Sequence, residues 1–78
     1  MNLSPAATVI RAFGGVRPLA RALGKAPSSI SRWQRQRKRG GTEGTIPASD
    51  QRRVLDVAAS LGLKLTADDL VHGRVVAD

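Results

Sequence analysis

Hydroxyl and guanidinium side chains recur within one short segment of the chain, at Ser28, Ser31, Arg32 and Arg35. At about 100° per helical residue, the four fall within roughly 100° of one another, and the apolar Ile30 and Trp33 fall on the opposite face. A guanidinium presents several N–H donors in one plane, and a hydroxyl both donates and accepts. This set favours binding of a hydrogen-bonding or anionic partner rather than catalysis.

The residues before this segment have the spacing of two short helices that cross closely. Between Val16 and Leu23 the apolar residues recur at intervals of three and four, which is typical of a helix with one buried face. Gly24 suits the left-handed conformation that ends a helix, and Pro27 suits the first position of the next. A tight crossing needs a small side chain, which Ala20 provides. The predicted core of this unit is Leu19, Ala20, Leu23, Gly24, Ile30 and Trp33.

This pattern resembles the helix-turn-helix of phage Cro and lambda-type repressor proteins. Counted from Val16 to Arg35, the fifth place is small, the ninth is glycine, and the fourth, eighth, fifteenth and eighteenth are apolar. The segment TIPASDQRRVLDVAASLG adds a weaker likeness to small Cro-type regulators. Pro27 departs from the pattern, because many relatives carry a polar base-reading side chain there. The resemblance implies an all-α, lambda-repressor-like bundle of four to five helices, encoded by a bacterium or a phage.

The resemblance also implies a site on double-stranded DNA, with a helix over residues 27–37 in the major groove. It places base contacts at Ser28 and Arg32, and the helical face adds Ser31 and Arg35. Arginine matches the O6 and N7 acceptors of guanine in that groove. We expect phosphate contacts from the residues that flank this face, namely Arg17, Lys25, Ser29, Arg37, Lys38 and Arg39.

Charge is distributed unevenly between the two halves of the 78-residue chain. Residues 1–42 hold nine arginines and lysines and no acidic residue, whereas residues 43–78 hold four basic and six acidic residues. Exclusion of acids from such a long stretch is typical of a surface for a polyanion. We expect one domain, made of a basic half over 1–38, a glycine-rich loop over 39–46, helices over 47–73 and a loose tail over 74–78.

Local signals predict where the other helices begin and end. Ser4 and Pro5 begin the first, which Gly14 and Gly15 end. Gly62 ends a helix that carries Val54, Val57, Ala58 and Leu61, and Thr66 with Asp69 forms a capping box for a short helix reaching Val71. The sequence has no alternating run long enough to predict a strand.

Several classes of function have no support in the sequence. The chain has one histidine, His72, and no cysteine, and it carries no phosphate-binding loop or metal-ligand motif. No stretch approaches the roughly 18 apolar residues of a membrane span, and no basic leader precedes an apolar core. We therefore expect a cytoplasmic, nucleoid-associated protein that is not an enzyme and needs no metal, cofactor or small-molecule ligand.

Reading an inverted-repeat operator would require two copies of the recognition helix, so we predict a homodimer. The joining surface should come from the C-terminal half, because the basic half faces DNA. Leu61, Leu65 and Leu70 are expected to complete the core. The predicted dimer surface consists of Leu63, Val71, Val75 and Val76.

Two alternatives to a repressor-like regulator of transcription remain open. The arginine-rich segment over residues 32–39 resembles segments that fold on RNA. Exposure of Trp33 to solvent would favour this RNA-binding alternative. A DNA-associated adaptor that grips a protein through its last helices would instead bind DNA without sequence preference.

Overall fold

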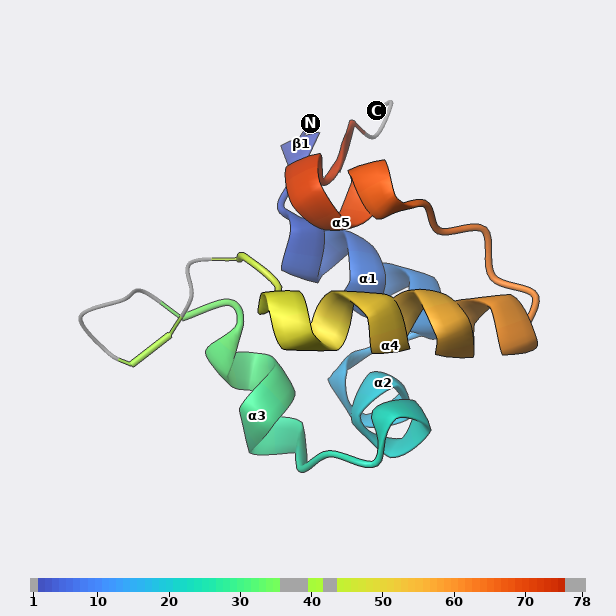
Figure 1. Ribbon diagram of the computed structural model, residues 1–78. Helices are drawn as coiled ribbons and strands as arrows, with labels where there is room; N and C mark the ends of the chain where they lie inside the picture. Colours follow the sequence, from blue (N-terminus) through green and yellow to red (C-terminus); the bar gives the residue numbers. More distant parts are fainter. Residues whose placement is uncertain (1, 36–39, 42–43, 76–78) are drawn as a thin grey trace.

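Five helices and one very short pair of strands make up the described part of the chain (Figure 1). The computed structural model describes residues 2–35, 40–41 and 44–75. The helices are α1 (Pro5–Phe13), α2 (Val16–Leu23), α3 (Pro27–Arg32), α4 (Ala48–Ser60) and α5 (Ala67–His72), and the strands are β1 (Asn2–Leu3) and β2 (Arg74–Val75). The predicted small all-α bundle is confirmed.

The helix ends follow the capping signals of the sequence. The Ser4 hydroxyl accepts a hydrogen bond from the Ala7 backbone N–H at 3.1 Å, which caps α1 just before Pro5. Gly24 ends α2 in the left-handed conformation, at φ 69°, and Pro27 begins α3 after a three-residue connection. Thr66 and Asp69 form the predicted capping box of α5. Local chemistry therefore accounts for the starts of α1 and α5 and for the end of α2.

The helices are arranged in two groups on either side of α4 (Figure 1). α1 packs against α5 and α2, while α2 packs against α3 and α4. In the view of Figure 1, α2 and α3 lie below α4, and α5 and the two strands lie above it. The pair α2 and α3 is thus one compact projection that α1 and α4 support.

One apolar core joins all five helices. Its buried residues from α2, α3 and the position after α3 are Leu19, Ala20, Leu23, Ile30 and Trp33. These residues match the predicted core, while Gly24 is exposed and acts through its backbone conformation. Ile46, which is 1% exposed, also belongs to the core and was not predicted. Ile46 stands between Thr45 and Pro47 and belongs to no periodic pattern of apolar residues that would predict its burial.

α3 is shorter than predicted, because it ends at Arg32 rather than at residue 37. Tighter i to i+3 hydrogen bonds continue the turn from Trp33 to Arg35. The Trp33 carbonyl accepts the Gly44 backbone N–H, and the Gly44 carbonyl accepts that of Ala6. This hydrogen-bonded link ties the position after α3 to the start of α1, and the helix predicted over residues 27–37 ends at Arg32.

Two other predictions about the C-terminal half need correction. The tail from residue 74 is not loose at its start, because Arg74 and Val75 pair with Leu3 and Asn2 in an antiparallel register. Leu61 does not complete the core, since it caps the end of α4 and is 59% exposed. Leu65 packs against the core and Leu70 is buried, as predicted.

Candidate nucleic-acid interface

α3 presents its polar residues on the side opposite its packed face. Ile30 is fully buried and Trp33, directly after the helix, is 4% exposed. Ser28 and Arg32 are exposed and Ser31 is half-buried. Because the apolar face is fixed in the core, the serine and arginine side chains are held in a defined orientation rather than on a loose segment.

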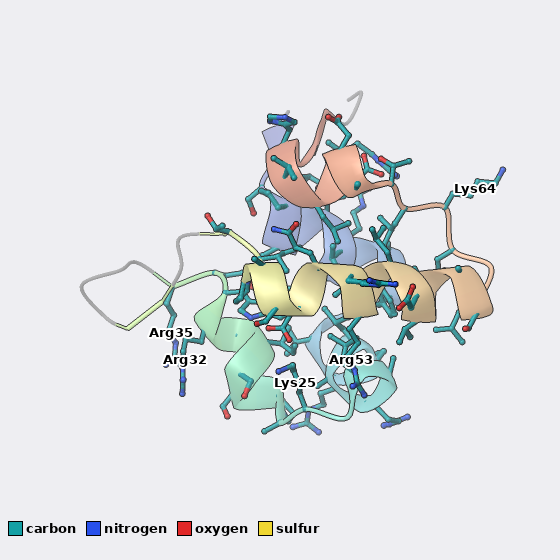
Figure 2. The ribbon with its side chains drawn as sticks, viewed as in Figure 1. Lys25, Arg32, Arg35, Arg53 and Lys64 are labelled. Carbon is teal, nitrogen blue, oxygen red and sulfur yellow. The ribbon has the colours of Figure 1, made fainter. Side chains whose placement is uncertain are left out.

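Arg35 lies in the turn that follows α3 and is also exposed. Figure 2 shows the side chains of Arg32 and Arg35 extending downward, away from α4. The continuous helix expected at Arg35 does not form, yet the fold brings its guanidinium to the same side as that of Arg32. A Cβ added at Gly41 would meet the backbone of Arg35, so glycine at position 41 allows the chain to pass close by.

Of the predicted phosphate-contact residues, three lie in the described part of the chain. Arg17 is exposed, and Ser29 and Lys25 are half-buried. The Lys25 ammonium forms an ion pair of 3.1 Å with the Asp50 carboxylate of α4. This carboxylate neutralises Lys25 in the free protein. Arg37, Lys38 and Arg39 lie outside the described residues.

Sequence reasoning missed two residues of α4 that lie beside the turn between α2 and α3. Asp50 holds Lys25, and the Arg53 guanidinium lies 3.7 Å from the place where a Gly24 Cβ would be. In Figure 2, Lys25 and Arg53 lie below α4, on the side of α2 and α3, whereas Lys64 lies above α4 on the connection to α5. No local pattern indicates these contacts, because they join residues far apart in the sequence.

An open hollow of about 260 Å³ lies between α2 and the start of α3. We call it the α2 hollow, and its lining residues are Arg17, Ala20, Arg21, Lys25 and Pro27. Three of the five carry a positive charge, so the hollow has the electrostatics of an anion site. Arg21 was not among the predicted contacts, although its spacing of four from Arg17 places both on one side of α2.

The residues of the predicted dimer surface differ in exposure and in the element that carries them. Val71 of α5 is 55% exposed, and Leu63 is half-buried. The backbone of Val75 pairs in β2, and Val76 lies outside the described residues. Leu61 and Val71 are the large apolar residues with high exposure in the described part of the chain.

Acidic and histidine side chains take part in local pairs on α5. The Arg74 guanidinium donates to the Asp69 carboxylate at 2.6 Å, and His72 lies 3.7 Å from Asp68. The Arg74 hydrogen bond is the main cause that lowers the pKa of Asp69, against a smaller opposing effect of desolvation. Within the described residues, no three acidic, histidine or cysteine side chains form a group suited to a metal ion.

Comparison of the chain with protein-family models, curated proteins and solved structures found no match. No helix in the described part of the chain is both long and apolar enough to cross a bilayer. The function of this surface therefore has to follow from the burial, geometry and charge of its own residues.

Proposed function

We propose that the protein is a sequence-specific regulator of transcription that binds double-stranded DNA through α3. The observation that carries this proposal is the division of α3 into two faces, one fixed in the core by Ile30 and the other presenting Ser28 and Arg32. The major groove is wide enough to admit an α-helix, and an exposed arginine there reads guanine. Occlusion of a promoter, as by a repressor, is the simplest mode of action for so small a domain.

Three further observations support DNA as the partner. The first 42 residues hold nine basic residues and no acidic residue, which suits a polyanion. The α2 hollow places cationic residues beside the start of α3, where the DNA backbone borders the groove. Trp33 is buried, so its ring is not presented for stacking on an RNA base.

Selection of bound duplexes from a random DNA pool tests the proposal. We expect the wild-type protein to enrich a short motif that contains guanine, because Arg32 is suited to that base. Single-stranded and hairpin RNAs of matched length should bind only weakly and without preference. Enrichment of an RNA hairpin would favour the arginine-rich segment as an RNA ligand, and binding of all duplexes alike would favour an adaptor.

A further inference from the structure

Arg17 and Arg21 stand one helical turn apart on α2 and both line the α2 hollow. Both residues are exposed, and neither forms an ion pair with any described residue. Like charges at this spacing repel each other and destabilise a helix slightly. An anion bound between them would relieve that repulsion, and no described residue compensates the charge of the pair.

The third cation of the hollow differs from the other two. The Lys25 ammonium is held by Asp50 at 3.1 Å, and the Asp50 side chain is only 14% exposed. The partly buried Asp50 carboxylate holds the Lys25 side chain in the lining of the hollow and neutralises its charge. The free positive charge of the hollow therefore comes from Arg17 and Arg21.

The hollow has room for an anion of several atoms and lies beside the first residue of α3. Its volume of about 260 Å³ far exceeds the roughly 10–15 Å³ that one water requires. Ala20 and Pro27, the first residue of α3, form the uncharged part of the lining. An anion here would lie beside Pro27, the first residue of the proposed recognition helix.

We propose that Arg17 and Arg21 together bind a single phosphodiester group of duplex DNA in the α2 hollow. This inference rests on the proposed function, and it adds a defined phosphate to it. The shared phosphate fixes α2 against one DNA strand and so sets how α3 enters the groove. Lys25, whose charge is paired with Asp50, forms part of the lining and contributes little to the release of counterions.

The test is a salt titration of binding to a duplex selected by the wild-type protein. Arg17→Gln, Arg21→Gln and the double variant are compared by fluorescence anisotropy between about 50 and 200 mM salt. We expect the double variant to reduce the slope of log affinity against log salt by about 0.9, the value for one phosphate, and to weaken binding about tenfold near 0.1 M salt. Each single variant should lose less than this, because the remaining arginine still holds the same phosphate.

Two further variants separate this site from general basicity. Lys64→Gln removes one exposed cation from the other side of α4. We expect the salt slope and the affinity of this variant to stay close to those of the wild type. Lys25→Gln should change the slope less than Arg17→Gln does. Circular dichroism and thermal melting of each variant confirm that the exposed substitutions leave the fold intact.

The outcomes distinguish this inference from the proposed function. If the protein selects no duplex, both fail. If it selects a duplex but the double variant behaves like Lys64→Gln, only the α2 hollow site is overturned. A slope reduced by about 1.8 in the double variant, with equal and additive single effects, would mean two independent phosphates and would also reject the shared site.

Discussion

At the scale of single residues, Arg32 and Lys64 are both exposed cations, but their surroundings differ in kind. Arg32 ends a helix whose opposite face is fully buried, so its position relative to the molecule is determined. Lys64 lies in the connection between α4 and α5. Charge alone therefore does not distinguish the two residues, whereas attachment to a packed helix does.

Arg32→Ala should relax sequence preference more than it weakens binding in general. Loss of a paired hydrogen bond to guanine costs about 1 to 3 kcal/mol on the selected duplex and little on a scrambled one. Competition binding with both duplexes measures the difference, and Lys64→Ala is the matched control. Equal losses on the two duplexes would show that Arg32 contacts the backbone and does not read a base.

Asp69 makes stability depend on pH at the acidic end. Its pKa is lowered chiefly by the hydrogen bond from Arg74, so the folded protein favours the carboxylate form. Such a group stabilises the fold at neutral pH, and this contribution is lost as the pH falls below the ordinary pKa of aspartate, about 3.9. Asp69→Asn should lower the Tm at pH 7, and the difference from wild type should narrow by pH 3.

Thermal melts monitored by circular dichroism at several pH values check this prediction. Asp68→Asn is the matched control, because Asp68 is exposed and its one ion pair within the described residues is with His72, at 3.7 Å. It should change the Tm less than Asp69→Asn does at pH 7. A constant difference between wild type and Asp69→Asn across the pH range would contradict the assigned role of the carboxylate.

At the scale of elements, the crossing of α2 and α3 depends on the small side chain of Ala20, which is 1% exposed. Ala20→Leu would force several extra carbon atoms into a packed contact, at a cost of about 1 to 3 kcal/mol. For a domain of this size, each kcal/mol corresponds to about 4 to 8 °C in Tm. Ala59→Leu, on an exposed part of α4, is the control and should leave the Tm nearly unchanged. Equal melting of the two variants would contradict a close crossing at Ala20.

Sequence reasoning located elements best where a helix end has its own chemistry. Ser4, Gly24 and Thr66 each act within a few residues of themselves, so their roles can be predicted without knowing the fold. The end of α3 depends instead on the hydrogen bond between Trp33 and Gly44, and a helical pattern contains no sign of that contact. The strands are two residues long, too short for any alternation to appear.

For the candidate site too, the sequence predicts local features but not contacts between distant residues. The exposed faces of α2 and α3 follow from helical periodicity, and Arg17, Ser28 and Arg32 lie where that periodicity places them. The ion pair between Lys25 and Asp50 joins the connection after α2 to α4, and the packing of α4 on α2 brings the two residues together. Periodicity thus predicts which residues face outward but not which of them neutralise each other.

At the scale of the whole molecule, one copy has too small a reading surface for a specific operator. α3 has six residues and is about 9 Å long, which spans roughly three base pairs at 3.4 Å each. A second recognition helix one helical turn away, about 34 Å, would double the sequence that is read. We therefore expect two copies related by a two-fold axis on an inverted repeat.

Val71, at 55% exposed, is more exposed than Leu63 of the predicted dimer surface, so Val71→Asp tests that surface. Sedimentation at micromolar concentration should show a dimer for the wild type, at least with a selected duplex, and a monomer for the variant. Ala59→Asp introduces the same charge at an exposed position on α4 and should leave the dimer intact. One wild-type monomer bound per duplex, with no effect of Val71→Asp, would contradict the homodimer.

The pairing of β1 with β2 has a practical consequence for attaching labels to the protein. Asn2 lies opposite Val75 in the register, on the side of the molecule away from α2 and α3 (Figure 1). A dye or surface anchor joined to β1 should therefore leave the arginines of α2 and α3 accessible. Protein immobilised through β1 should capture duplexes with the affinity it has in solution, whereas an anchor at Val75 of β2 would occupy the predicted dimer surface.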